Sequence, residues 1–550
     1  MFSMLLSLWL LASSPVLAIW PAPSSISTGE STLWIGSGLS VTYNGKILPW
    51  TYGYEPMGSK FSSSEIIKGG VARAMKNIVH NNFVPWMLYN RMELETTEPS
   101  LFKSKTYINH LDITQSGTDS SKTFKPLAGE VDESYSLSVN KNGKVSIKAV
   151  SSTGVLRALE SFSQLFFQHS KGPFFYTKSA PISITDKPEY DHRGVLFDVS
   201  RSFFPMDSIL RTIDAMAYNK MNRIHIHATD SHPADLAKIQ QYAVNRGIEP
   251  IIEIDTPGHF GIAALSHPEI VAGWDSAPWT AYCAEPPCGQ IRLNEPKVDP
   301  FLDKLMNDIL PRVSPYSAYF HTGGDEVNFN MYNLDPTVGT NDSSVIVPLL
   351  QKFIDKHHAR VRKSGLVPMV WEEIPADYNV TIGKDVVIQS WLGDEAIAAL
   401  TAKGHKVITS NYNYWYLDCG RGQWLNFGGA DLETYYPFPD WCSPYKNWRL
   451  VYSYDPRANL TDEQAELVLG GELAAWSESI DDATIDDILW PRASAAGEVL
   501  WSSPKGRTQL EAAPRLAEFR ERMIARGIKS GTVHMPYCTQ GLNSTACQYL

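Results

Sequence analysis

Short apolar runs alternate with helix-like segments from residue 194 to residue 476, and this rhythm constrains the fold more than any other feature of the chain. The runs resemble buried strands because they are rich in Val, Ile and aromatic residues, and several segments between them have helical spacing. The runs are Gly194–Asp198, Arg223–His227, Pro250–Ile254, Tyr319–Phe320, Val367–Trp371, Val386–Trp391, Lys406–Ser410 and Leu473–Trp476. Eight or nine such units over about 350 residues predict an α/β fold of the (β/α)8 TIM barrel type. A doubly wound open sheet is the alternative.

The chain of 550 residues exceeds what one hydrophobic core usually organises, so we expect two domains. Before the barrel rhythm begins, three runs alternate like strands and two segments have helical spacing. These are the strands Tyr107–Ile113, Ser134–Val139 and Lys144–Val150 and the helices Ser62–Asn77 and Gly154–Phe167, the second capped by Thr153 or Ser152. The mixture predicts a small α+β domain over residues 19–186, a linker at Pro181–Pro188, and the barrel with a C-terminal helix and tail over residues 187–550.

Residues 1–18 have the pattern of a secretion signal peptide. An apolar run from Leu5 to Leu11 leads to small residues that end at Ala18 and suit a signal peptidase. No Lys or Arg precedes the run, which leaves a buried helix as the alternative. No later stretch approaches the roughly 20 apolar residues that cross a bilayer, so we expect no membrane partner. The expected location is secreted or extracellular, with a vacuolar or lysosome-like compartment as the alternative.

Cysteine and asparagine motifs agree with an oxidising compartment. The six cysteines are Cys283, Cys288, Cys419, Cys442, Cys538 and Cys547. An even number in a secreted chain predicts disulfides, and among the many connectivities we favour nearest-neighbour pairing. No pair has CxxC spacing, which argues against structural zinc. Glycosylation sequons begin at Asn341, Asn379, Asn459 and Asn543 and predict modified surface loops.

The charge balance argues against a nucleic-acid partner. The formal net charge is -11 and the isoelectric point is near 5.7, and the chain has no basic tract. Contact with phosphates needs clustered Lys and Arg. The sequence has no Gly-rich phosphate loop, and Gly323-Gly324 precedes acids rather than a Lys.

The stretch Tyr319–Val327 is the strongest candidate for chemistry. A strand-like apolar run ends in Gly323-Gly324, and two adjacent carboxylates, Asp325 and Glu326, follow at once. The glycines release the backbone so that both side chains can reach one cavity, whereas neighbouring residues of a regular strand face opposite ways. Two carboxylates so close cannot both ionise cheaply, and a partly protonated carboxyl is what general acid catalysis needs. A solvated surface turn is the alternative.

Polar and aromatic residues collect where the predicted strands end. In a barrel of this type the catalytic groups lie at the C-terminal ends of the strands. In chain order these residues are Asp198, Arg201, His227, Asp230, Asp255, His259, Asp325, Glu326, Trp371, Glu372, Trp391, Tyr416, Asp418, Trp476 and Glu478. Tryptophans among carboxylates favour a sugar pocket, because the C–H faces of a sugar stack on indole while its hydroxyls take charged hydrogen-bond partners.

Several of these motifs resemble the β-N-acetylhexosaminidases of glycoside hydrolase family 20. They are His-x-Gly-Gly-Asp-Glu from His321, Asp-Val-Ser-Arg at 198–201, Asp-Thr-Pro-Gly-His at 255–259, Trp-Glu-Glu at 371, Trp-Tyr-Leu-Asp at 415 and Gly-Gly-Glu-x-x-x-Trp-x-Glu at 470–478. In the first domain, Asp132–Tyr135 and the helix Gly154–Phe167 are similar to the non-catalytic domain of that family. The motifs are long and occur in the family's order, and the form Trp-Tyr-Leu-Asp-Cys-Gly is most similar to its secreted fungal members.

The resemblance implies a role for each motif residue. Asp325 would hold the substrate's acetamido N–H while that group's own oxygen attacks the anomeric carbon, and Glu326 would act as general acid and base, so that the reaction retains configuration. The implied substrate-binding residues are Arg201, Asp230, Trp371, Trp391, Tyr416, Asp418, Trp476 and Glu478. Asp255, His259 and His321 would support them. No cofactor and no metal is implied. The implied partners are oligosaccharides ending in N-acetylglucosamine or N-acetylgalactosamine, with chitin fragments among them, and a second copy in a homodimer.

The chain departs from the family pattern after its second barrel strand. Family members usually carry a loop of a few tens of residues there, whereas Asp230-Ser231-His232 runs almost directly into Pro233. Ile226 replaces the usual Trp between two histidines. A catalytically impaired glycoprotein that binds N-acetylhexosamine is therefore one alternative function. A metal-dependent amidohydrolase is another, because His225 and His227 at a strand end could bind zinc.

Overall fold

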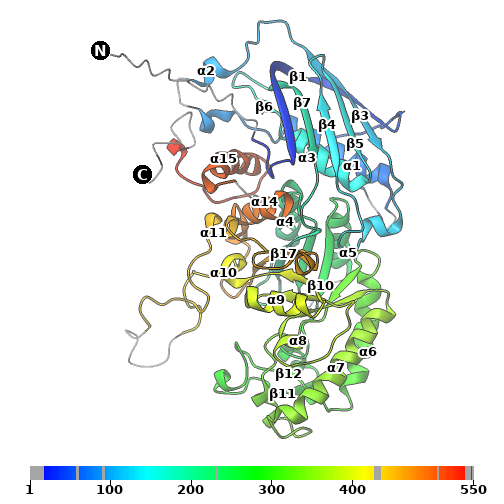
Figure 1. Ribbon diagram of the computed structural model, residues 1–550, viewed down its shortest axis with the longest axis vertical. Helices are drawn as coiled ribbons and strands as arrows, with labels where there is room; N and C mark the ends of the chain where they lie inside the picture. Colours follow the sequence, from blue (N-terminus) through cyan, green and yellow to red (C-terminus); the bar gives the residue numbers. More distant parts are fainter. Residues whose placement is uncertain are drawn as a thin grey trace.

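The structure is a computed structural model that describes residues 18–56, 58, 61–89, 93–228, 233–426, 435–503, 507–538 and 547. An α+β domain built around one sheet is followed by a closed barrel of eight parallel strands (Figure 1). The predicted fold class is confirmed, and the doubly wound open sheet is excluded because a closed barrel has no sheet edge.

The first domain contains a seven-stranded sheet with the order β2-β1-β3-β5-β4-β7-β6. Its strands are β1 Ser25–Tyr43, β2 Lys46–Ile47, β3 Tyr107–Gln115, β4 Tyr135–Val139, β5 Lys144–Ala149, β6 Phe167–Gln168 and β7 Phe175–Asp186. Helices α1 (Ser63–Val79) and α3 (Ser152–Ser163) pack together on the sheet and share one hydrophobic core with it. A short helix, α2 (Leu94–Thr97), lies between β2 and β3 in the chain.

Two details of this domain differ from the sequence prediction. The segment predicted as a linker at Pro181–Pro188 belongs to β7 as far as Asp186. A proline is tolerated inside this strand because the pairing of β1 with β7 shifts register between Thr28 and Ser31, opposite Pro181. The cap of α3 is Ser151 rather than Thr153 or Ser152, since the Ser151 hydroxyl accepts the Gly154 N–H at 3.1 Å.

The barrel closes in the order β8-β9-β10-β13-β14-β15-β16-β17 and back to β8. Its strands are β8 His192–Asp198, β9 Arg223–His227, β10 Glu249–Glu253, β13 Tyr319–His321, β14 Val367–Trp371, β15 Val387–Ser390, β16 Lys406–Thr409 and β17 Val468–Ala475. A small ribbon of β11 (Val271–Ala272) and β12 (Gln290–Ile291) stands in the loop after β10. All eight strands are parallel, so their C-terminal ends share one mouth.

Helices lie around the barrel. They are α4 Met206–Tyr218, α5 Pro233–Val244, α6 Val298–Val313, α7 Ser343–Lys363, α8 Glu373–Ala376, α9 Asp394–Ala402, α10 Tyr412–Trp415, α11 Trp448–Tyr452, α12 Asp462–Ala465, α13 Ile485–Leu489, α14 Arg492–Ser502 and α15 Gln509–Ala525. Of these, α6 and α7 lie toward the bottom of Figure 1. The last helix also contacts the first domain, because Arg522 on α15 donates to the backbone oxygen of Phe166 at 2.8 Å. Among the described helices, none is both long enough and apolar enough to cross a membrane.

Buried ion pairs join the two domains. Lys220, after α4 of the barrel, donates to Asp186 at the end of β7 (2.8 Å) and to the Tyr135 hydroxyl of β4 (2.9 Å). The side chains of Lys220 and Asp186 are both fully buried. Arg193 of β8 reaches Glu133 of the first domain at 2.7 Å. Because buried charges must be paired and hydrogen-bonded, these contacts fix how the sheet sits on the barrel.

The cysteines form three disulfides, Cys283–Cys288, Cys419–Cys442 and Cys538–Cys547, which is the nearest-neighbour pairing. Three sequon asparagines, Asn341, Asn379 and Asn459, are exposed. The fourth, Asn543, lies outside the described residues.

Loss of the interdomain ion pair should destabilise the protein strongly. In Lys220→Met the Asp186 carboxylate stays buried without its cation, so we expect a loss of about 3–5 kcal/mol. The matched control is Lys356→Met, which breaks an exposed pair with Asp299 and should cost less than about 1 kcal/mol. Calorimetric unfolding of both variants measures the difference. Equal unfolding midpoints would contradict the joining role of Lys220.

Candidate active site

The turn after β13 carries Asp325 and Glu326 to the mouth of the barrel. Gly323 and Gly324 have φ angles of +74° and +105°, which side chains rarely adopt. A Cβ at Gly323 would lie 1.7 Å from the Asp255 carboxylate, so the close approach itself requires glycine. The Gly324 N–H donates to Asp255 at 2.9 Å, which ties this turn to the loop after β10. Glu326 itself has a φ of +53°, a strained conformation of the kind that collects at functional sites.

Glu326 is paired with His259 from the loop after β10. Nε2 of His259 lies 3.0 Å from the Glu326 carboxylate. Burial alone would lower the pKa of His259, but the hydrogen bond to Glu326 and the charge of Asp325 raise it to about 9. Burial alone would raise the pKa of Glu326. The hydrogen bond from His259 has the larger effect, so the pKa of Glu326 is lowered. At neutral pH the pair therefore holds one proton, on His259, next to a carboxylate that is partly exposed.

Asp325 and Asp255 form a second buried pair. Burial, followed by the neighbouring charge of Asp255, raises the pKa of Asp325 well above its usual range. Burial and the charge of Glu253 raise the pKa of Asp255 to about 7. Two buried carboxyls that are hydrogen-bonded to each other share a proton rather than ionise together. Oδ1 of Asp325 is buried and meets no hydrogen-bond donor among the described residues, so it can accept an N–H from a ligand.

Four aromatic residues form one wall of the mouth. Trp391 stacks on Tyr416 with centroids 5.8 Å apart, and Trp476 lies 6.0 Å from Trp371 and 6.4 Å from Tyr416. Two indole N–H groups are fixed by buried carboxylates: Trp371 donates to Glu253 at 2.8 Å, and Trp391 donates to Glu373 at 3.0 Å. The rings are thus held at set angles and form an aromatic surface of the kind on which the apolar faces of a sugar stack.

Charged groups at the other side of the mouth surround Arg201. Its guanidinium contacts Glu285, lies 3.6 Å from Asp198 and lies 5.0 Å from the Trp476 ring. Burial, with the charge of Glu285, raises the pKa of Glu478 to about 8. Burial likewise raises the pKa of Asp418 to about 7. Near neutral pH both carboxyls therefore retain protonated forms, Glu478 more than Asp418, and can offer hydrogen-bond donors as well as acceptors.

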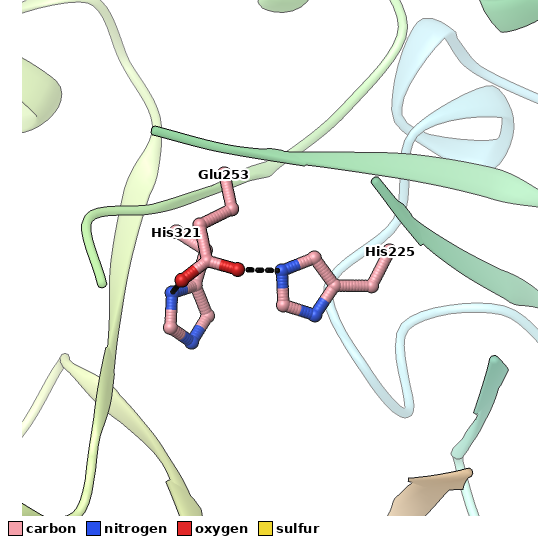
Figure 2. A group of neighbouring side chains, drawn as sticks. All are labelled: His225, Glu253 and His321. Carbon is pink, nitrogen blue, oxygen red and sulfur yellow. Dashed lines mark ion pairs between the residues drawn. The ribbon is translucent and has the colours of Figure 1, made fainter. Parts of the chain in front are cut away.

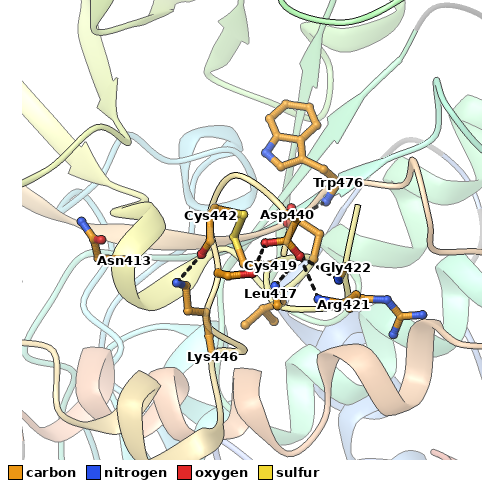
Figure 3. Close-up of a disulfide and its surroundings, with 12 residues drawn as sticks. Asn413, Leu417, Cys419, Arg421, Gly422, Asp440, Cys442, Lys446 and Trp476 are labelled. Carbon is orange, nitrogen blue, oxygen red and sulfur yellow. Dashed lines mark hydrogen bonds between the residues drawn. A yellow bond between two sulfur atoms is a disulfide. The ribbon is translucent and has the colours of Figure 1, made fainter. Parts of the chain in front are cut away.

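A disulfide fastens the segment that carries Tyr416 and Asp418 (Figure 3). Cys419 follows Asp418 directly and is bonded to Cys442. Asp440, near the second cysteine, accepts backbone N–H groups from residues 420, 421 and 422 at 2.7–3.0 Å. The Trp476 N–H approaches Asp418 at 3.5 Å. This staple holds the seventh loop of the barrel over the pocket.

The structure brings most of the predicted site residues to one mouth. These are Arg201, Asp255, His259, Asp325, Glu326, Trp371, Trp391, Tyr416, Asp418, Trp476 and Glu478. His321 is different: it lies inside the barrel beside Glu253 rather than at the mouth (Figure 2). Asp230 lies outside the described residues.

Sequence reasoning missed four residues of the site. Glu285 lies between Cys283 and Cys288, and the shortness of that loop was its only signal. Glu373 was visible as the second acid of Trp-Glu-Glu, and Glu253 as a lone acid in an apolar run. Trp441, an exposed ring 5.9 Å from Trp391, precedes Cys442 and extends the aromatic wall outward.

The histidines considered as zinc ligands have carboxylate partners. Nε2 of His225 and Nδ1 of His227 both lie near one oxygen of Glu253, at 3.0 and 2.9 Å. Together with His321, His225 and Glu253 are close enough to surround a cation. They are nevertheless fully buried inside the barrel, below the mouth, where a metal-bound water could not reach a substrate.

Comparisons with known proteins agree on one family. The sequence model "Glycosyl hydrolase family 20, catalytic domain" matches residues 190–233 and 232–504, and the model "beta-acetyl hexosaminidase like" matches residues 19–165. A beta-hexosaminidase of Arthroderma benhamiae is 36% identical, over 95% of this chain and 96% of its own length. A chitooligosaccharidolytic beta-N-acetylglucosaminidase of Ostrinia furnacalis is 31% identical, over 76% of this chain and 75% of its own.

Solved structures share the fold. An exo beta-N-acetylglucosaminidase from Vibrio harveyi, in complex with N-acetylglucosamine, superposes with a TM-score of 0.71 at 20% identity, covering 94% of this chain and 79% of that one. A chitobiase from Flavobacterium johnsoniae gives a TM-score of 0.68 at 23% identity, covering 93% and 73%.

The surplus of buried acids should make stability depend on pH. The folded-state pKa of Glu478 is raised to about 8, so its contribution to stability is full below the unfolded pKa near 4.3 and is lost as pH rises through 8. We expect the unfolding midpoint of the protein to fall over this range. Glu478→Gln should flatten the fall by an amount on the order of a few kcal/mol. Glu463→Gln, an exposed control on α12, should leave the fall toward pH 8 unchanged, because hydrogen bonds lower the pKa of Glu463 and confine its contribution to acid pH.

Proposed function

Because this chain belongs to glycosyl hydrolase family 20, we propose that it is a β-N-acetylhexosaminidase that removes terminal non-reducing N-acetylhexosamine residues from oligosaccharides. One observation carries the proposal. Asp325, with a buried unpartnered oxygen, and Glu326, paired with a protonated His259, enter the same aromatic-lined mouth from adjacent positions in the chain. That arrangement suits a substrate with both an amide and a leaving oxygen.

The proposed mechanism uses the substrate's own acetamido group as the nucleophile. Its carbonyl oxygen attacks the anomeric carbon while the glycosidic C–O bond breaks, and Glu326 gives a proton to the leaving oxygen. The positive charge of the resulting oxazolinium ion is offset by Asp325, which accepts the acetamido N–H. Water then attacks the anomeric carbon and loses a proton to Glu326, while the bond from that carbon to the acetamido oxygen breaks and restores the acetamido group. Two inversions give net retention, and Glu326 regains its proton.

The His259–Glu326 pair supports both steps. The acid step needs a proton on Glu326, and His259 stores one at 3.0 Å with a pKa of about 9. The base step needs an ionised Glu326, and the His259 hydrogen bond favours that state. The pair therefore holds a proton between turnovers: it gives that proton to the leaving oxygen and regains one from the attacking water.

The remaining residues of the mouth are proposed to bind the sugar. Trp371, Trp391 and Trp476 would cover its apolar faces, and the Tyr416 hydroxyl would hold the acetamido carbonyl. Arg201, Asp418 and Glu478 would bind hydroxyls. Asp230, which lies outside the described residues, is proposed to bind a hydroxyl as well. Protonated Asp418 and Glu478 can donate to hydroxyls as well as accept.

We propose a secreted, glycosylated protein with a natural substrate among chitooligosaccharides. The apolar leader, the disulfides and the exposed sequons at Asn341, Asn379 and Asn459 support secretion. The name of the Ostrinia furnacalis relative supports the substrate class. Both N-acetylglucosamine and N-acetylgalactosamine ends are candidates, and a homodimer is the proposed assembly.

A binding protein without turnover is the second candidate, and one observation favours it. The match to the family's catalytic model is split at residues 232–233, where the loop that usually follows the second strand is missing. Release of nitrophenol from 4-nitrophenyl N-acetyl-β-glucosaminide by the purified protein distinguishes the two. Full activity in excess EDTA would also exclude the amidohydrolase alternative.

Substitution of the two acids should separate their roles. Glu326→Gln should lower kcat on chitobiose by about 10³-fold or more, and lower it less on the nitrophenyl glycoside, because nitrophenolate leaves without protonation. Asp325→Asn should lower kcat about 10²–10³-fold on both substrates, since each needs the acetamido group to attack. Initial rates measure the effects, and NMR of the first released anomer tests retention. Wild-type-like rates for Glu326→Gln would rule out the assignment.

A further inference from the structure

A buried carboxylate below the mouth, Glu253, lies among four side chains of the barrel interior and the site. It is the last residue of β10, is completely buried and points into the barrel (Figure 2). One oxygen lies 3.0 Å from His225 and 2.9 Å from His227. The other accepts the indole N–H of Trp371 at 2.8 Å and lies 3.1 Å from His321. Three of these four neighbours lead to the active site.

The contact with Trp371 is direct. This indole is almost fully buried and lies next to Trp476, so it is the innermost ring of the aromatic wall. Its N–H is its only polar atom, so the Glu253 carboxylate fixes the direction of the whole ring plane. Without a charged acceptor, the ring could rotate about its side-chain bonds.

His227 links Glu253 to Arg201 through its two ring nitrogens. Nδ1 of His227 meets Glu253, and its other nitrogen, Nε2, lies 3.2 Å from the Arg201 guanidinium. The imidazole edge also packs against Trp476 at 5.1 Å. Glu253 therefore sets the tautomer and orientation of His227, which contacts two proposed sugar-binding residues, Arg201 and Trp476.

His321 supports the catalytic turn from inside the barrel, and no hydrogen bond from Glu253 holds it, because its Nδ1 already accepts a backbone N–H. Nδ1 of His321 lies near Glu253 and accepts the Gly323 N–H at 3.0 Å. Gly323 begins the left-handed turn that presents Asp325 and Glu326. The position of this turn is thus set from below by His321 and from the side by Asp255.

We propose that Glu253 is the positioning residue of this active site: its buried carboxylate fixes Trp371 and His227 by hydrogen bonds, and through them the sugar-binding wall. The inference rests on the proposed glycosidase function. A second buried glutamate provides a comparison that can distinguish this positioning role from a general contribution to packing.

That glutamate is Glu472 of β17. It is also completely buried, and it also accepts from two histidines, His192 at 2.6 Å and His225 at 3.0 Å. Gln389 donates to it at 3.1 Å. None of these three partners contacts the aromatic wall through a hydrogen bond in the described part of the chain. Glu472 is therefore matched to Glu253 in burial and charge but lacks its links to the mouth.

The test compares Glu253→Gln with Glu472→Gln in the full-length protein. Both variants lose a buried charge, so similar falls in unfolding midpoint are expected. Glu253→Gln should lower kcat/KM about 10²-fold, because small misplacements of reacting groups have effects of this size. Glu472→Gln should change it by less than about threefold. Equal losses in the two variants would overturn the proposal, and an inactive wild type would instead refute the proposed function.

Two further readouts separate positioning from stability. The negative charge of Glu253 contributes to the raised pKa of Asp255, so Glu253→Gln should move the limb of the pH profile that reports the Asp255–Asp325 pair to lower pH, and Glu472→Gln should not. Should Glu253→Gln fail to fold, His227→Gln replaces it. That variant should raise KM more than it lowers kcat, because His227 contacts only binding residues at the mouth. An unchanged KM would overturn the link to Arg201.

Discussion

The crowding of buried carboxyl groups at the barrel mouth is the constraint on which the rest of the structure depends. Asp255, Asp325, Asp418 and Glu478 all have raised pKa values, although Arg201 faces Asp255 and Glu478, His259 faces Asp325, and Arg492 faces Asp418. Negative charges so close in a low-dielectric environment cannot all ionise, so the site retains protons that free carboxyls lose well below neutral pH. The glycine turn, the indole wall and the disulfide staple keep these groups at fixed separations and away from water.

The interior of the barrel is unusual for the same reason. Barrels of this type are mostly filled with layers of Val, Ile and Leu. Here two layers are ionic: Glu472 with His192 and His225, and above it Glu253 with His225, His227 and its other partners. Such networks contribute little net stability over an apolar core, but they fix orientation because each partner has one satisfying geometry. The upper of these two layers, through Glu253, thus orients Trp371 and His227 at the mouth.

The sequence predicted the barrel well because each strand is a short apolar run with clear ends, and Arg223–His227 and Val367–Trp371 match the structure residue for residue. It did not predict β1, whose Ser, Thr and Gly content lacks alternation and whose pairing is bulged. It found the residues at the mouth from their positions after strands. It missed Glu253 and Glu285, because the importance of a single acid depends on which distant side chains surround it in space.

The joint between the domains has a consequence for how such a protein can evolve. Asp186 and Glu133 of the sheet neutralise Lys220 and Arg193 of the barrel in a region without solvent. A gene fragment encoding the barrel alone would leave two uncompensated cations on a surface that is apolar around them. A barrel without the sheet domain would therefore have to replace Lys220 and Arg193 before it could be stable alone, which couples the two domains in evolution.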